Sequence, residues 1–180
     1  MATRISLTLS NRDLRYFRDA VRRARDTVAD AEEDEIVDAI RDVIQNIRSN
    51  GPLPDFITGR MPALELLTEM LSDEAWRLPK HERERLVATF IYFCDPEDLI
   101  PDDIPGIGYL DDVIMIELLM RDMRHVTEAY QDFCKFRDAL DYTSGEDKAK
   151  KLKKRAAQLH DRMRRRLRAD KERGSKSSLW

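Results

Sequence analysis

Hydrophobic residues recur every three or four positions along most of this chain, which is the spacing of one face of an α-helix. Ser10 and Asp13 form a capping-box pattern just before the first such stretch, whose hydrophobic stripe is Leu14, Phe17, Val21, Ala24 and Val28. No segment alternates hydrophobic and polar residues for long enough to predict a β-strand with a partner. The pattern therefore predicts an all-α fold, a bundle of five to six helices joined by short turns. The expected helices cover about residues 10–28, 36–50, 61–76, 78–94, 110–140 and 147–171.

A segment rich in proline and aspartate interrupts this pattern between two apolar runs. Residues 95–112 contain three prolines, two glycines and seven acidic residues. Aspartate and proline in this arrangement fit the starts of helices and the turns between them. We therefore expect an ordered connector that caps one end of the bundle, with Leu99, Ile100, Ile104 and Ile107 packed into that end.

The aspartates of the connector are also the candidate metal ligands, because clustered carboxylates are what Mg²⁺ and Ca²⁺ prefer. The candidates are Asp98, Asp102, Asp111 and Asp112. Their spacing matches no EF-hand loop, and the three histidines lie too far apart for a transition-metal site. We therefore expect no cofactor, and a divalent cation at these aspartates is the alternative. Glu117, inside the apolar run 113–120, is expected to point outward and pair with Arg121, or to act as a base beside such a metal.

Charge divides the chain into parts of opposite sign. Residues 145–180 carry 14 Lys and Arg against five Asp and Glu, a net charge of +9. Residues 1–144 carry 18 and 30 of these residues, a net charge of −12. We expect an acidic helical bundle over 1–144, a basic amphipathic helix over 145–173 and a flexible tail over 174–180.

The basic helix has two interpretations. Its apolar stripe and its charge can pack on the acidic body of the same molecule or of a second copy. Alternatively, its cations bind nucleic acid or an anionic membrane. The cations considered for such binding are Lys151, Lys154, Arg155, Arg162, Arg165 and Arg166.

The motifs of the chain do not favour catalysis. It contains no GxSxG, Walker-type loop, HExxH or GxGxxG. Its first residues lack the apolar run of a signal peptide, no apolar run is long enough to span a bilayer, and Cys94 and Cys134 are expected to be reduced and buried. These patterns predict a cytoplasmic, non-enzymatic interaction protein that self-associates or docks on a protein partner. Peripheral attachment to the inner membrane and a metal-dependent enzyme using the aspartates are the alternatives.

Residues 88–122 also resemble the YkvA-like (DUF1232) family. The family pattern is Tyr-x-x-x-Pro-x-Asp-Leu-Ile-Pro-Asp-x-Ile-Pro-x-x-Gly-x-Leu-Asp-Asp followed by an apolar helix, and this chain matches it in order and spacing from Tyr92 to Asp112. The resemblance implies a small α-helical bacterial protein, and it marks the aspartates without assigning them a catalytic role. Many similar proteins look membrane-associated and are more apolar after the Asp-Asp pair, whereas Glu117 and Arg121 make this chain resemble a soluble variant.

Overall fold

The computed structural model describes residues 6, 8–27, 33–49, 54–94, 100, 104, 107–140 and 146–173. Within these residues the structure is all-α and has no strand, which confirms the predicted fold class. The helices are α1 (Asn11–Thr27), α2 (Glu33–Ser49), α3 (Asp55–Thr58), α4 (Met61–Ser72), α5 (Lys80–Cys94), α6 (Leu110–Asp122), α7 (Arg124–Ala139) and α8 (Glu146–Glu172). None of these helices is long and apolar enough to cross a membrane.

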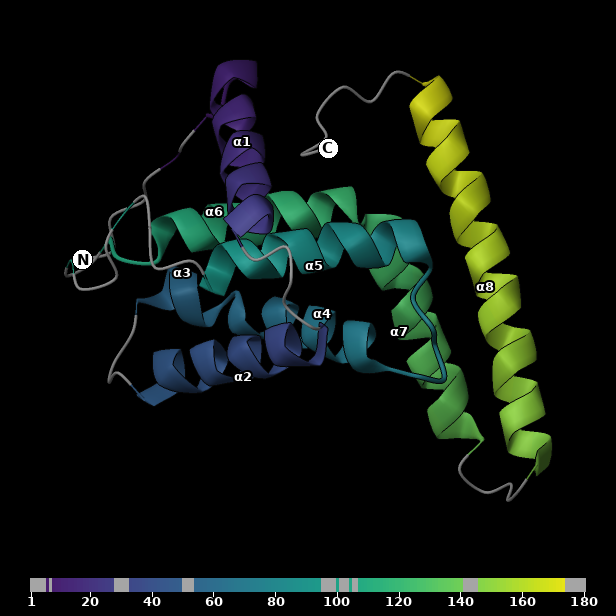
Figure 1. The fold of residues 1–180 in the computed structure, drawn as a ribbon. Helices are drawn as coiled ribbons and strands as arrows, with labels where there is room; N and C mark the ends of the chain where they lie inside the picture. The colour runs from purple at the N-terminus through teal and green to yellow at the C-terminus, as the bar shows by residue number, and fades with distance from the viewer. Residues whose placement is uncertain are drawn as a thin grey trace.

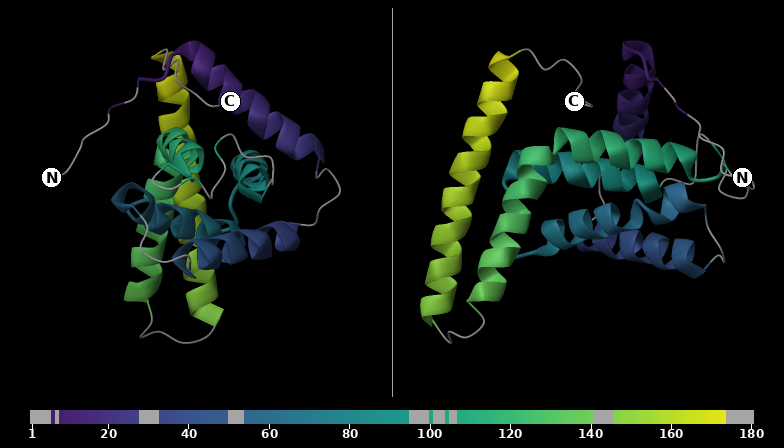
Figure 2. Two further views of the ribbon diagram at one scale, coloured as in Figure 1. Left: turned by 90° about the vertical axis from the view of Figure 1, so that its left-hand side faces the viewer. Right: turned by 180° about the vertical axis from the view of Figure 1, so that it is seen from behind.

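The helices form two layers with a hairpin at one end (Figure 1). The pair α2 and α4 lies beneath the pair α5 and α6, and α1 crosses α5 on the opposite side (Figures 1 and 2). The hairpin consists of α7 and α8, which run antiparallel to each other. One core joins the two layers, since Ile40, Leu67, Phe90 and Leu119 from four different helices are all fully buried.

The start of α1 follows the capping box that the sequence predicts. The backbone N–H of Ser10 donates to Asp13 Oδ2 at 2.7 Å, and the Ser10 Oγ accepts from the N–H of Asp13 at 3.4 Å. These hydrogen bonds with Ser10 lower the pKa of the Asp13 carboxyl. The predicted stripe of Leu14, Phe17 and Val21 is buried.

The single long helix expected over 110–140 is wrong, because the chain turns at Met123. This residue lies between α6 and α7 with φ −95° and ψ 12°, and its side chain is completely buried. The turn lets α7 leave the α5–α6 layer and pack against α8 (Figure 2). The break at Met123 and the short helix α3, which the pattern does not predict, give the described chain more helical segments than the five to six expected.

The loop between α4 and α5 sets the position of the hairpin. The expected helix 61–76 ends at Ser72, because Asp73 Oδ1 accepts the backbone N–H groups of the next turn, including that of Trp76 at 3.0 Å. Asp73 Oδ2 accepts from the Tyr130 hydroxyl at 3.1 Å and from Arg137 Nη1 at 2.6 Å, both on α7. Trp76 is fully buried, and the centroid of its ring lies 4.3 Å from the centroid of the His160 ring on α8. The loop thus holds both helices of the hairpin.

Candidate functional site

Asp111 is a buried hydrogen-bond acceptor where three segments meet. It lies in the first turn of α6 and is 2% exposed. Its Oδ2 accepts from the Tyr92 hydroxyl on α5 at 3.3 Å and from the backbone N–H of Ile100 at 3.2 Å. One carboxylate therefore ties α5 and α6 to the connector, and the tyrosine and aspartate of the sequence pattern meet in space.

Asp112 has a different environment. It is half-buried at a cavity of about 80 Å³ whose lining is chiefly apolar and includes Phe93, Val113 and Ile116. Tyr109, the residue just before α6, takes the left-handed conformation with φ 64°. This lining differs from the shell of oxygen ligands that Mg²⁺ or Ca²⁺ needs.

The other two candidate aspartates, Asp98 and Asp102, lie outside the described residues. Within the part of the chain that the structure describes, no group of three or more His, Cys, Asp or Glu could hold a metal ion. The metal site therefore stays a prediction. Ile104 and Ile107 are 38% and 47% exposed, so the expectation that they pack into the bundle end is wrong.

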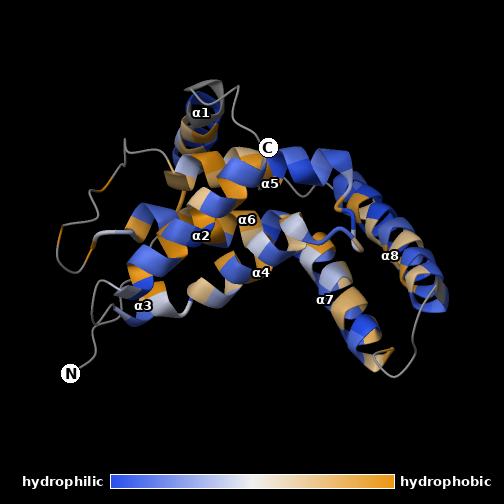
Figure 3. Ribbon diagram, turned by 60° about the horizontal axis from the view of Figure 1, so that its bottom comes forward, coloured by the Kyte–Doolittle hydropathy of each residue, from blue (hydrophilic) through white to orange (hydrophobic). Residues whose placement is uncertain are grey.

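The basic helix α8 packs on the body of its own molecule, which confirms one interpretation of its sequence. Its apolar stripe faces α7 and is buried, with exposed fractions of 2% for Leu159 and 1% for Met163. Leu152 and Ala156 extend this stripe toward the start of the helix. Hydrophobic bands recur along the otherwise hydrophilic ribbon of α8 (Figure 3).

Two arginines of α8 reach acidic residues of α7. Arg162 forms an ion pair with Asp132, and this hydrogen bond lowers the pKa of the Asp132 carboxyl. Arg166 forms an ion pair with Glu128 at 2.8 Å. The sequence places acidic residues on α7 and basic ones on α8, but it does not show which of them meet.

Two further contacts join the ends of the hairpin. Near its open end, Asp170 of α8 lies 2.7 Å from His125 Nε2 and 3.1 Å from Arg124 Nη2, and the hydrogen bond with His125 lowers the pKa of the Asp170 carboxyl. Nearer the other end of the hairpin, the Arg155 guanidinium lies over the Phe136 ring, 5.4 Å from the ring centroid. Of the six predicted binding cations, Arg155, Arg162 and Arg166 are therefore in contact with α7.

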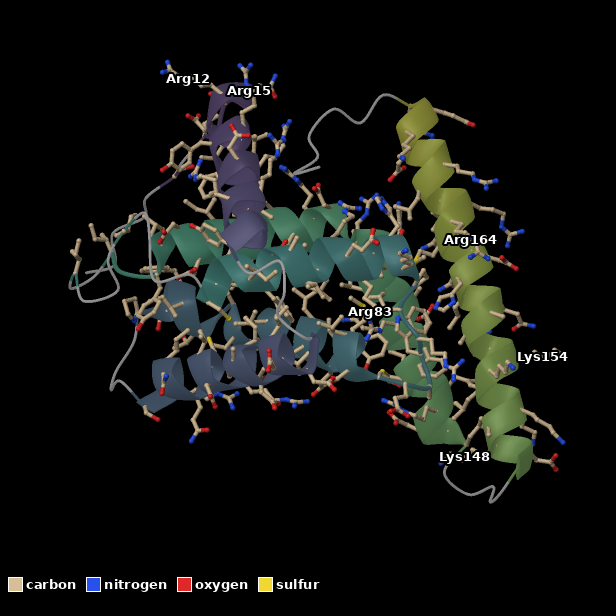
Figure 4. All side chains as sticks on the ribbon, viewed as in Figure 1. Arg12, Arg15, Arg83, Lys148, Lys154 and Arg164 are labelled. Atoms are coloured by element: carbon tan, nitrogen blue, oxygen red, sulfur yellow. The ribbon has the colours of Figure 1, made fainter. Side chains whose placement is uncertain are left out.

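The remaining three predicted cations lie on the opposite side of α8. Lys151, Lys154 and Arg165 are exposed, and Arg168 continues their row. We call these four residues the outer ridge. None of the four forms an ion pair with a residue that the structure describes. Figure 4 shows Lys154 on the side of α8 that is turned away from α7.

Two other predictions need correction. Cys94 and Cys134 are free, as expected, but they are not buried: Cys94 is exposed at the end of α5 and Cys134 is half-buried. Glu117 is exposed, as expected, and it forms an ion pair with Arg60, which the sequence pattern does not predict.

These residues define an all-α protein with a buried Tyr–Asp contact at its connector and a cationic outer ridge on its last described helix. Residues 85–118, which cover most of α5, the connector and most of α6, match the model of a family described as "Protein of unknown function (DUF1232)". The match confirms the resemblance that the connector residues indicate. No curated protein and no solved structure matched the chain. The function is therefore argued from the residues of this chain.

Proposed function

We propose that this protein is a non-enzymatic interaction protein that docks an anionic partner through the outer ridge of α8. The observation that carries the proposal is the division of α8 into two faces. The inner face is occupied by α7, whereas the cations of the outer ridge are exposed and lie in a row roughly 25 Å long. The proposal requires no cofactor.

The proposed compartment is the cytoplasm, with the surface of the inner membrane as a second location. Insertion of an amphipathic helix into lipid requires a free apolar face. Leu159 and Met163 of α8 are instead buried against α7, so α8 would have to leave α7 before it could insert. Attachment by charge alone, through the outer ridge, is the form of membrane binding that the proposal includes.

We also propose that the connector acts as a structural cap of the helical bundle. The hydrogen bonds of Asp111 with Tyr92 and with the backbone of Ile100 support this role. Because Asp111 Oδ2 accepts from a donor of α5 and from a donor of the connector, the contact supports a structural role.

Retention on immobilised heparin, a generic polyanion, tests the proposed surface. The variant Lys154→Glu/Arg165→Glu changes the net charge by the same amount as the control Arg12→Glu/Arg15→Glu, whose exposed arginines lie on α1 (Figure 4). We expect the outer-ridge variant to elute at a clearly lower salt concentration than the wild type, and the α1 control to elute close to the wild type. Equal shifts of both variants would mean that only net charge matters, and would contradict the proposal.

Sedimentation of the wild type alone, at low and high salt, tests whether the partner is a second copy. Part of the body is acidic, since α2 exposes Asp34, Asp38 and Asp42. Association at low salt that disappears at high salt, and that is absent in Lys154→Glu/Arg165→Glu, would identify the second copy as the partner.

A further inference from the structure

We infer that the anionic partner of the outer ridge is the phosphate backbone of a nucleic acid. This inference rests on the proposed function and names the class of partner. Its first basis is the chemistry of the exposed face of α8. The large hydrophobic side chains that are exposed in the described part of the chain are Tyr16, Phe56, Ile104 and Ile107, none of which lies on α8. The face therefore offers cations without an apolar centre.

This chemistry separates the three kinds of anionic partner. A stable protein interface has an apolar core, and each exposed ion pair contributes only about 0–1 kcal/mol. An amphipathic helix that binds a membrane surface combines cations with apolar residues that insert into the lipid. The apolar residues of α8 are instead buried against α7. A nucleic acid needs neither, because each phosphate that a lysine or arginine neutralises releases condensed counterions.

The arrangement of charge on α8 points in the same direction. Asp161, the exposed acidic residue nearest the middle of α8, is paired with Arg164 on the same helix. The other exposed acidic residues in the described part of the helix, Asp147 and Glu172, lie near its ends. The exposed acidic residues of α2 lie in the lower helix layer, far from the outer side of α8 (Figure 1). A chain with a formal net charge of −3 can therefore present a locally cationic surface to a polyanion.

The same face predicts how the nucleic acid is read. Phe, Tyr and Trp are absent from α8 between residues 146 and 173, and the ring of His160 is packed against Trp76. Binding through lysine and arginine alone contacts phosphates, which carry no sequence information directly. We therefore expect backbone binding that does not depend on base sequence.

Fluorescence anisotropy with a labelled DNA duplex of about 20 base pairs, and with an RNA of equal length, tests the inference on the full chain. Four phosphate contacts predict a slope of about −3.6 for log affinity against log salt with duplex DNA, a roughly 100-fold loss between 50 and 200 mM. In Lys154→Glu/Arg165→Glu the slope should weaken by about 2, with at least a tenfold loss of affinity at 50 mM salt. The matched control Arg12→Glu/Arg15→Glu should keep the slope of the wild type. A second outer-ridge variant, Lys151→Gln/Arg168→Gln, should weaken the slope by about 2 as well.

The outcomes distinguish this inference from the proposed function. Heparin retention that depends on the outer ridge, without binding of either nucleic acid, would overturn the inference and leave the proposed function standing. Binding to vesicles that contain phosphatidylserine, or self-association in sedimentation, would then name the partner instead. Nucleic-acid binding that the α1 control loses equally would also overturn it, because the outer ridge would not be the surface used.

Discussion

At the scale of single residues, Asp111 is the connector carboxylate whose structural role is best defined. Asp111→Ala removes the acceptor of the buried Tyr92 hydroxyl and of the half-buried Ile100 N–H. We expect the free energy of unfolding in urea to fall by about 2–4 kcal/mol, because each unsatisfied buried group costs about 1–3 kcal/mol. Tyr92→Phe removes only the hydroxyl and should cost about 1 kcal/mol. A smaller effect for Asp111→Ala than for Asp112→Ala would contradict the structural role.

His160 gives the docking of α8 a dependence on pH. Burial lowers the pKa of its imidazole below the ordinary value of 6.5. Because the folded-state pKa lies below the unfolded one, protonation favours the unfolded chain. The stability contributed by the neutral ring is complete above about pH 6.5 and is lost as the pH falls below that value.

The measurement is the urea midpoint at about pH 7.5 and pH 5, for the wild type and for His160→Gln. We expect the wild type to lose more stability between the two pH values than the variant does, since glutamine does not titrate. The other titratable groups are the same in both proteins, so their contributions cancel in the comparison. Equal losses would show that the ring of His160 does not control the pH dependence.

At the scale of helices, the buried stripe of α8 should hold the hairpin together. Leu159→Ala or Met163→Ala opens a cavity between α7 and α8, and we expect a loss of about 2–5 kcal/mol. Gln158→Ala, on the exposed side of the same helix, is the matched control and should change stability by less than about 0.5 kcal/mol. Urea denaturation measures both, and hydrogen exchange in α8 reports whether the helix has left α7.

The ion pairs between α7 and α8 should matter less than this stripe. The side chains of Arg162 and Asp132 are 36% and 38% exposed, and those of Arg166 and Glu128 are each 46% exposed. Water screens such pairs, so Arg162→Ala and Arg166→Ala should each cost no more than about 1 kcal/mol. A cost above that of Met163→Ala, measured in the same urea experiment, would show that charge dominates the docking.

The sequence predicts the helices that follow from the local spacing of hydrophobic residues. It misses the helix breaks that are caused by contacts between distant residues. The stripe of Leu14, Phe17 and Val21 and the capping box at Ser10 are local patterns, and both are confirmed. No glycine or proline at Met123 marks the turn in the sequence. The turn arises instead from the packing of α6 and α7 on different neighbours. The contact of the α4–α5 loop with the hairpin is equally distant in sequence, since the partners of Asp73 on α7 lie 57 and 64 residues away.

At the scale of the whole molecule, added divalent metal should leave the thermal stability unchanged. Anything that binds only the folded chain raises its melting temperature. We therefore expect the same melting temperature with and without Mg²⁺, Ca²⁺ or Mn²⁺, followed by circular dichroism. A rise in the wild type that is absent in Asp98→Asn and Asp111→Asn would instead establish the metal site and reopen hydrolytic chemistry, with Glu117 as a candidate base.

The candidate site could be predicted from the sequence only in part, because a charge count does not show which cations face the body and which face the solvent. Composition shows that residues 145–180 are basic, and helical spacing groups their cations into faces. Only the docking of α8 on α7 separates Arg162 and Arg166, which contact acidic residues, from Lys154 and Arg165, which form no ion pair with a residue that the structure describes. The role of Asp111 was equally out of reach, since Tyr92 approaches it from another helix.

The two faces of α8 also differ in how freely they can change. Substitutions on the inner face must preserve the packing with Trp76 and α7, so few residues fit there. The outer ridge contacts no described part of the body through an ion pair, so its lysines and arginines can be exchanged with little effect on folding. The specificity of the surface can therefore diverge, by natural drift or by design, while the scaffold beneath it stays the same.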